Sequence, residues 1–311
     1  MKLSFVIPCY NEEENVLLIH DSIEEVFKKT KFSYEMIFIN DGSKDSTLFN
    51  LKKILDSSKS NIKVINFSRN FGKEAAIFAG LKESSGEMVS LIDADMQQNP
   101  KYVLDMVTFL DENPEYDSVA MYQSKRKEGK VLSFFKKSFY KIINKISDTE
   151  FTENASDFRT LRRCMVDSIL SMQEYYRFSK GIFSWIGFNT YYMPYEVSKR
   201  ATGTTKWSFR KLFKYALDGI ISFTTAPLRM ATYIGLISAF GAVINIIVVI
   251  VQKLAFGIDV PGYATIITLL LFLGGVQLFS LGIIGEYIGR TYIEIKKRPI
   301  YIAKEIMKNK E

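Results

Sequence analysis

Two aspartates stand one residue apart at the end of an apolar run in MVSLIDADMQ, residues 88–97. In an extended segment residues i and i+2 point the same way, so we expect the side chains of Asp93 and Asp95 to face one crevice. Their repulsion is relieved if a divalent cation or a sugar hydroxyl lies between them. Carboxylate oxygens suit Mg²⁺ or Mn²⁺. A lone pair of this kind is weak evidence, because carboxylates at loop starts are commonly helix caps or solvated charges.

The elements that must position these aspartates follow from hydrophobic periodicity. Short apolar runs at residues 2–10, 34–41, 62–68, 87–95 and 117–124 alternate with helical patterns at residues 13–29, 43–58, 72–85 and 100–113. This alternation predicts an α/β fold with a mainly parallel sheet covered on both faces by helices. In such sheets ligands bind beyond the carboxyl ends of the strands. We therefore expect the polar stretches 10–14, 41–43, 70–73 and 93–97 to line one crevice.

The C-terminal third is different in kind. No charged residue occurs from Met230 to Gln252 or from Val260 to Gly285, and each run exceeds the ~20 residues that a helix needs to cross a bilayer. These runs predict two transmembrane helices, with a hairpin of buried core helices as the alternative. Seven basic residues lie within residues 199–229 and another seven within residues 286–311. By the positive-inside rule, this distribution predicts that both flanks are cytoplasmic. The protein is then expected in the cell membrane, as a multi-pass protein with both termini cytoplasmic.

Composition narrows the class of partner. A formal charge of +7 suggests anionic partners such as nucleic acid, a phosphorylated substrate or an anionic membrane face. Fourteen of the 41 basic residues lie in the two membrane flanks, so membrane proximity is a simpler cause than nucleic-acid binding, and we expect no nucleic-acid partner. The two cysteines, Cys9 and Cys164, lie far apart in sequence, which makes a disulfide framework or a zinc site improbable.

The order of four motifs resembles a known family. Their order resembles that of the family 2 glycosyltransferases with the GT-A fold. The motifs are VIPCYNEEENV, INDGSKDST, SRNFGKEAAIFAGL and LIDADMQQNP. Within that family the chain resembles the polyprenyl-phosphate glycosyltransferases, a group that includes dolichol-phosphate mannose synthase and bacterial undecaprenyl-phosphate glucosyltransferases. The resemblance continues through SDFRTLRR, YRFSKGIFSWIG, KRATGTTKW and both apolar runs, and it covers nearly the whole chain.

The resemblance implies four regions. Residues 1–198 would form a cytosolic, Rossmann-like GT-A domain, and residues 199–229 a basic loop with amphipathic helices at the membrane interface. Residues 230–289 would hold the two transmembrane helices, and residues 290–311 a cytosolic basic tail. Trp207, Leu212 and Phe213 fall on one helical face with Arg210 and Lys211 toward the other, which suits a helix lying in the interface. A homo-oligomer formed through the membrane helices is compatible with this organisation.

The same resemblance assigns residues to the donor. It implies that seven positions bind the nucleotide sugar and that three positions bind the divalent cation. Two of the three cation positions, Asp93 and Asp95, are the D-x-D pair. The nucleotide-sugar positions are Pro8, Tyr10, Glu12, Asp41, Lys73, Asp93 and Ala94, and the cation positions are Asp93, Asp95 and Gln97. The family usually shows D-D-G-S where this chain has Asn40, so a role of the first acidic position is in doubt. A strand-to-helix turn with a cap is the alternative for Tyr10 and Asn11.

The reaction implied is inverting, metal-dependent transfer of a hexose from a nucleotide sugar to undecaprenyl phosphate, giving a polyprenyl-phosphate sugar for cell-envelope glycan modification. UDP-glucose or UDP-N-acetylglucosamine is the expected donor, and Mg²⁺ or Mn²⁺ the cofactor. Because the two substrates carry like charges, the site also needs basic groups for the acceptor phosphate. Arg126, Arg200 and Lys206 match basic positions of the family's phosphate-binding loops. Attraction to lipid headgroups is the alternative for any basic residue near a membrane.

Asp157 in SDFR matches the acidic residue that the family places near the acceptor, and with Asp95 it is our catalytic candidate. It acts either as a base or as a positioning group, because a phosphate monoester with a second pKa of about 6 is already largely ionised at neutral pH. A helix N-cap ahead of FRTLRRCMV is the alternative. Two other functions remain open: an enzyme that uses GDP-mannose, like dolichol-phosphate mannose synthase, and a non-catalytic nucleotide-sugar sensor.

Overall fold

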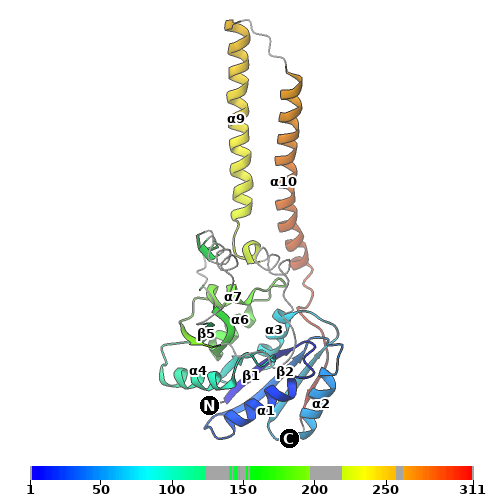
Figure 1. Cartoon of the computed structure of the whole chain (residues 1–311), viewed down its shortest axis with the longest axis vertical. Coiled ribbons are helices and arrows are strands. Elements are labelled where there is room, and N and C mark those ends of the chain that lie inside the picture. The colour runs from blue at the N-terminus through cyan, green and yellow to red at the C-terminus, as the bar shows by residue number, and fades with distance from the viewer. Residues whose placement is uncertain are drawn as a thin grey trace. The chain divides into compact units, whose positions relative to one another are not determined.

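The computed structural model describes residues 2–123, 140–141, 143–145, 147, 152, 155–196, 219–256 and 262–309. The chain divides into two units (Figure 1). The first comprises residues 1–145, 149–219 and 298–311, and the second comprises residues 146–148 and 220–297. The expected interface helices within residues 199–218 lie outside the described residues.

The first unit is built on a mixed sheet, which in the described residues has eight strands in the order β7-β5-β6-β4-β1-β2-β3-β8. The strands are β1 (Lys2–Cys9), β2 (Ser33–Asn40), β3 (Asn61–Phe67), β4 (Met88–Leu91), β5 (Ser118–Gln123), β6 (Ala155–Arg162), β7 (Thr190–Tyr195) and β8 (Ala303–Lys308). The four central strands, β3, β2, β1 and β4, run parallel, as the sequence predicts. The sheet is mixed toward its edges, because β6 is antiparallel to β4 and β5, and β8 is antiparallel to β3.

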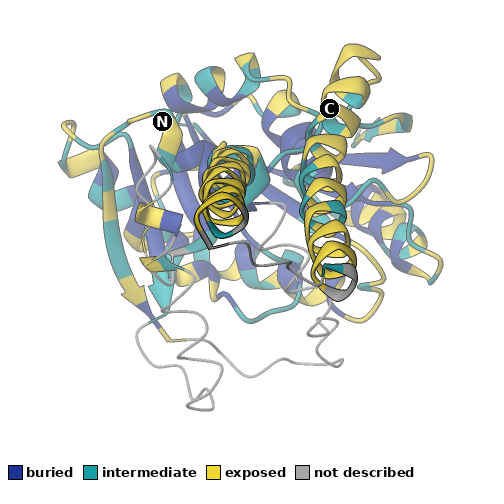
Figure 2. Cartoon of the chain, turned by 90° about the horizontal axis from the view of Figure 1, so that it is seen from above, coloured by how far each residue is buried: buried dark blue, intermediate teal, exposed yellow. Residues whose placement is uncertain are grey.

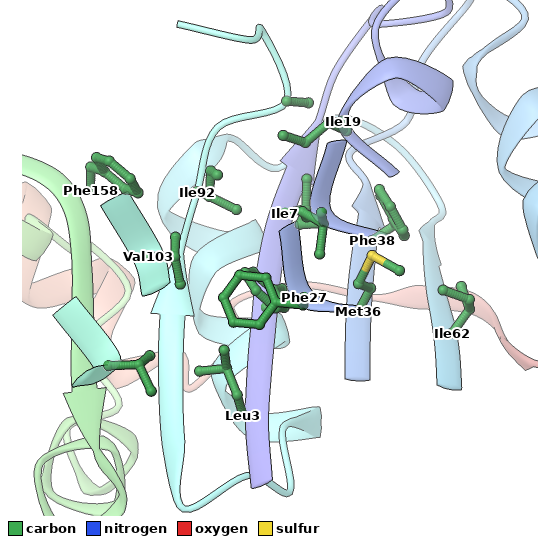
Figure 3. Close-up of a cluster of buried hydrophobic side chains, with 14 of the residues drawn as sticks. Leu3, Ile7, Ile19, Phe27, Met36, Phe38, Ile62, Ile92, Val103 and Phe158 are labelled. Carbon is green, nitrogen blue, oxygen red and sulfur yellow. The ribbon is translucent and has the colours of Figure 1, made fainter. Parts of the chain in front are cut away.

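Helices cover both faces of this sheet. They are α1 (Val16–Phe27), α2 (Thr47–Ser57), α3 (Lys73–Glu83), α4 (Pro100–Glu112), α6 (Arg163–Ser171) and α7 (Ser179–Trp185). Alternate residues of each strand point to opposite faces, so Leu3 and Ile7 pack with Ile19, Phe27 and Val103 in a core under α1, α2 and α4 (Figure 3). All four predicted helical patterns are helices, and α4 begins where Asn99 caps a first turn that opens with Pro100.

The opposite face of the central strands is covered by α3. A Cβ atom added to Gly80 would lie 2.2 Å from Cγ1 of Val6 and 2.9 Å from Cδ1 of Ile39, so only glycine lets the helix approach this closely. Because α3 connects parallel strands, its N-terminal end lies at the carboxyl edge of the sheet. That edge is where the polar loops after β1, β2 and β4 also lie.

The strand β8 joins the sheet from the far end of the chain. The sequence predicts a basic tail here and no strand. Glu305 accepts a hydrogen bond from Nδ2 of Asn66 at 2.9 Å, and the ring of Tyr301 stacks on Phe67 with centroids 4.9 Å apart. Asn309 accepts a hydrogen bond from the backbone N–H of Ile62 at 3.0 Å. The segment therefore closes the β3 edge of the sheet.

The second unit contains the helices α9 (Ala226–Phe256) and α10 (Tyr263–Ile295). Residues 226–252 and 265–295 each contain an 18-residue stretch of high mean hydropathy, 2.7 in the first and 2.2 in the second, and both are long and apolar enough to cross a membrane. Their apolar side chains are exposed along most of both helices (Figure 2). This exposure does not fit the alternative of a buried core hairpin, because an apolar surface of such extent marks contact with lipid or another protein.

Candidate active site

The loops that follow β1 and β2 are tied to each other by hydrogen bonds. The backbone N–H of Asn11 donates to the Ser43 hydroxyl at 3.0 Å, and Oδ1 of Asn11 accepts from the backbone N–H of Lys44 at 2.9 Å. The backbone N–H of Glu12 donates to Oγ1 of Thr47 at 2.8 Å. Asn11 has φ +52°, a left-handed conformation that asparagine tolerates better than most residues. The two loops are thus interlocked at the carboxyl edge of the sheet.

Asp41 ties the loop after β2 to the loop that leads into α3. Its carboxylate oxygens accept hydrogen bonds from the backbone N–H groups of Phe71 at 2.6 Å and Gly72 at 3.0 Å. The side chain is buried, and burial raises the pKa of Asp41 to about 6 against the lowering effect of these two bonds and of Arg69. In the structure, the bonds from Phe71 and Gly72 to Asp41 fix the start of α3. The contact of Asp41 with the donor base stays a prediction.

Asp93 and Asp95 do not sit in an extended segment, so the alternation argument that placed them on one side is wrong. β4 ends at Leu91, Ala94 and Asp95 form a turn, and Met96 follows with φ +60°. Asp93 accepts a hydrogen bond from Nε2 of Gln98 at 3.1 Å. Oδ1 of Asp95 accepts from the backbone N–H of Gln97 at 3.2 Å. Both aspartates remain at the carboxyl edge of β4, and their contact with one crevice stays a prediction.

Lys73, the first residue of α3, joins two acidic side chains, one from the loop after β4 and one from β6. Its Nζ lies 2.7 Å from Oδ1 of Asp93 and 3.4 Å from Oδ2 of Asp157. Partial desolvation acts to lower the pKa of Lys73, but the charges of Asp93 and Asp157 outweigh it and raise the pKa above its ordinary value. The three predicted residues therefore meet in one charged cluster, which we call the Lys73 cluster.

Asp157 lies inside β6, because α6 begins only at Arg163. The alternative role as a helix N-cap is therefore wrong. Burial acts to raise the pKa of Asp157, but the positive charges of Lys73, Lys180 and Arg159 lower it below its ordinary value, so the carboxylate is ionised at neutral pH. Within the described part of the chain, Oδ1 of Asp157 is buried without a hydrogen-bond partner.

Arg159 stands two residues beyond Asp157 on the same face of β6, and the sequence analysis did not single it out. Its guanidinium lies 3.8 Å from the ring centre of Phe183 and donates to the carbonyl of Ser156 at 2.9 Å. Only 4% of the residue is exposed, and its Nε has no hydrogen-bond partner among the described residues. Burial lowers the pKa of Arg159 to about 10. Alternate residues of a strand share one face, so the spacing of Arg159 from Asp157 is the sequence feature that could have identified it.

Glu74 connects α3 to α7 beside this cluster, and it too was missed. Its Oε2 accepts hydrogen bonds from the backbone N–H of Ser179 at 3.0 Å and from the Ser179 hydroxyl. Burial, and after it the charge of Asp157, raise the pKa of Glu74 to about 7 against the effect of those bonds. The contact fixes the start of α7, where Lys180 follows Ser179.

The remaining predicted site residues are distributed as follows. Pro8, Glu12 and Gln97 are half-buried, Tyr10 is exposed at the end of β1, and Ala94 is buried in the turn after β4. Arg126, Arg200 and Lys206 lie outside the described residues. In the part of the chain that the structure describes, no group of three or more His, Cys, Asp and Glu side chains is arranged to hold a metal ion. A cation here would need ligands beyond the protein's acidic groups.

Comparisons with known proteins identify the family. Residues 4–170 match the model of glycosyl transferase family 2, and residues 226–291 match that of the GtrB C-terminal hairpin. The chain is 48% identical over 304 residues to CsbB of Bacillus subtilis (strain 168), which is named as a glycosyltransferase, with 97% of this chain and 91% of that protein covered. It is 40% identical over 306 residues to the bactoprenol glucosyl transferase of Shigella phage SfII, with 98% of each chain covered.

Among solved structures, a glucosyl-3-phosphoglycerate synthase from Mycobacterium tuberculosis, in complex with Mn²⁺, UDP-glucose and phosphoglyceric acid, aligns with a TM-score of 0.46 and 17% identity. The alignment covers 70% of this chain and 76% of that chain. The family match spans more than half of the chain, and it includes the loops after β1, β2 and β4 together with Lys73 and Asp157. The chain belongs to glycosyl transferase family 2.

Proposed function

We propose that this protein transfers glucose from UDP-glucose to a polyprenyl phosphate, with inversion at the anomeric carbon. The acceptor phosphate oxygen forms a bond to that carbon as the bond to the leaving nucleoside diphosphate breaks. Family membership and the name of the phage relative, a bactoprenol glucosyl transferase, support the reaction and the sugar. UDP-N-acetylglucosamine and GDP-mannose are the alternative donors.

The observation that carries the proposal is the contact of Lys73 with both Asp93 and Asp157. The reaction brings a diphosphate and a phosphate together, and a site for it must hold positive charge close to the reacting centre. Lys73, Arg159 and Lys180 all act on Asp157, so three cations surround one ionised carboxylate. Because the attacking phosphate oxygen is itself ionised near neutral pH, we assign Asp157 to orienting the acceptor or the sugar.

A divalent cation fits the residues after β4. Asp95 and Gln97 offer oxygen atoms, and Mg²⁺ is commonly held by one or two carboxylates together with substrate phosphates. Asp93 is instead ion-paired with Lys73, so we place it on the sugar side of the donor and Asp95 on the cation side. When bound, the cation would neutralise charge that develops on the leaving diphosphate.

We place the active site at the cytoplasmic membrane face, with α9 and α10 spanning the bilayer. The seven basic residues on each side of the hairpin support this topology. Arg126, Arg200 and Lys206 remain our candidates for the acceptor phosphate. Reporters fused before Met1 and after Glu311 should both be cytoplasmic, and a reporter within residues 253–259 should be external. Opposite locations for the two termini would exclude the topology.

The experiment that tests the function is lipid labelling. Membranes that contain the full chain are incubated with radiolabelled UDP-glucose, UDP-N-acetylglucosamine or GDP-mannose, together with polyprenyl phosphate, and the organic extract is counted. We expect label from UDP-glucose in the lipid fraction, and loss of that label in Asp95→Asn. Asp167→Asn, an exposed carboxylate on α6, is the matched control and should retain activity. Binding of donor without any labelled lipid would favour the sensor.

A further inference from the structure

A cavity of about 210 Å³ lies between the start of α3 and the loop that joins α6 to α7. Its walls include Phe71, Glu74, Tyr175, Tyr176, Arg177 and Ile300. Pockets that enclose drug-sized ligands measure about 300–1,000 Å³, so this cavity has room for one sugar ring and not for a whole nucleotide sugar. None of its wall residues was predicted as a site residue.

Two charged groups in the wall are held in fixed positions. Oε2 of Glu74 accepts a hydrogen bond from the backbone N–H of Ser179. The Arg177 guanidinium lies 4.5 Å from the ring centre of Phe78 and donates to the carbonyl of Met172 at 2.5 Å. An isoprenoid chain in this cavity would desolvate both groups without offering hydrogen bonds, which is costly. A sugar ring offers hydroxyls that donate and accept, and an apolar face that suits aromatic rings such as that of Tyr176. The wall chemistry therefore favours a carbohydrate.

The cavity also adjoins the Lys73 cluster. Glu74 follows Lys73 on α3, and Nζ of Lys73 is 3.4 Å from Asp157. Burial, and after it the charge of Asp157, raise the pKa of Glu74. A sugar whose anomeric carbon reacts near Asp157 would have its ring beside Glu74.

We propose that this cavity is the subsite for the transferred hexose, and that Glu74 and Arg177 select the sugar by hydrogen bonding to its hydroxyls. The inference rests on the proposed function, because it assigns the sugar of the same donor. Glu74 accepts from a hydroxyl hydrogen and Arg177 donates to a hydroxyl oxygen. A site built to bond a hydroxyl discriminates strongly against a sugar that lacks it, since its own polar groups then lose their partner.

The test compares the affinity for UDP-glucose with the affinity for UDP, measured by calorimetry on the full chain in detergent with Mn²⁺ present. Glu74→Gln keeps an oxygen for Ser179, and Arg177→Lys keeps the positive charge. We expect each variant to bind UDP-glucose about tenfold more weakly, the effect of one hydrogen bond to a charged group. Affinity for UDP should be unchanged, which a general folding defect would not allow. Glu25→Gln, at an exposed position on α1, is the control.

The outcomes separate this inference from the proposed function. If the wild-type protein transfers no sugar to lipid, the function itself fails. If the wild-type protein transfers glucose while both variants bind UDP-glucose within twofold of wild type, the subsite is overturned and the function stands. If the variants raise only the KM for polyprenyl phosphate, the cavity belongs to the acceptor, which also overturns the subsite.

Discussion

The two sides of the candidate site differ in how their polar groups are satisfied. On the side of β1, β2 and α3, loop groups bond to each other, as Asp41 does to the backbone of Phe71 and Gly72. On the side of β6, Asp157 and Arg159 keep buried polar atoms that have no partner in the described residues. Buried polar groups normally find partners. The first side is therefore pre-formed, whereas the second leaves polar atoms that a substrate could bond; under the proposed function the first side would hold the nucleotide.

The largest effect is expected at Asp95, which we place beside the cation and the leaving diphosphate. Asp95→Asn should lower the transfer rate about 10²- to 10³-fold, the loss typical when one group that stabilises developing charge is removed. An amide cannot replace a charged ligand at a diphosphate. The measurement is lipid labelling at saturating UDP-glucose, with and without excess EDTA. Full activity in EDTA would contradict the role of the cation.

The side of β6 should lose both activity and stability when its negative charge is removed. Asp157→Asn removes a buried charge that has one unpartnered oxygen, and Lys73 retains its contact with Asp93. We expect transfer to fall about a hundredfold. The unfolding midpoint in detergent should fall as well, because the buried guanidinium of Arg159 loses its counter-charge. An unchanged or higher midpoint would show that Asp157 serves the site without stabilising the fold.

The interlocked side should be the less tolerant of added volume. A Cβ atom on Gly42, which has φ +63°, would lie 2.4 Å from the backbone carbonyl carbon of Arg69. Gly42→Ala should destabilise the protein by about 2–4 kcal/mol, the sum of left-handed strain and overpacking, and should weaken UDP binding. Gly187 has φ +71° with nothing within 4 Å, so Gly187→Ala should cost only the strain, about 1–2 kcal/mol. Equal losses from the two variants would argue against the tight interlock.

The smallest effect concerns pH and Glu74. Its folded pKa of about 7 lies above the ordinary 4.5, so the folded protein holds more protons than the unfolded chain between these values. The free energy of unfolding should then fall as pH rises from 4.5 to 7, by about 1–2 kcal/mol. Glu74→Gln should reduce this slope without abolishing it, because Asp41 titrates in the same direction. Unfolding midpoints at pH 5 and pH 7.5 measure the difference, and an unchanged slope would contradict it.

Sequence periodicity was sufficient for the central architecture and for bringing the loops of Lys73 and Asp93 to one edge of the sheet, but it did not predict that Asp157 meets them. Five apolar runs became β1 to β5, because strands buried on both faces leave continuous apolar stretches. β6 escaped detection since Asp157, Arg159 and Thr160 interrupt its apolar pattern, and the same segment reads as a capped helix. An extended segment was expected at Asp93 and Asp95, but a turn at Ala94 breaks the strand period there.

Other features depend on contacts that no local pattern encodes. β8 pairs with a strand about 240 positions earlier in the chain, as the bond from Asn66 to Glu305 shows. The cavity beside Glu74 exists because the loop with Arg177 packs against the start of α3. Sequence could have marked Arg159 by its spacing from Asp157, but its burial against Phe183 required the fold.

The position of β8 also sets an order for making the protein. The strand is synthesised after α9 and α10, so β3 leaves the ribosome well before the segment that covers its edge. Domains fold as units during synthesis, and an uncovered sheet edge invites pairing with other chains. The sheet that carries the active site can therefore be completed only after the apolar hairpin has emerged, so a nascent chain that stalls within the hairpin would hold an open, aggregation-prone edge.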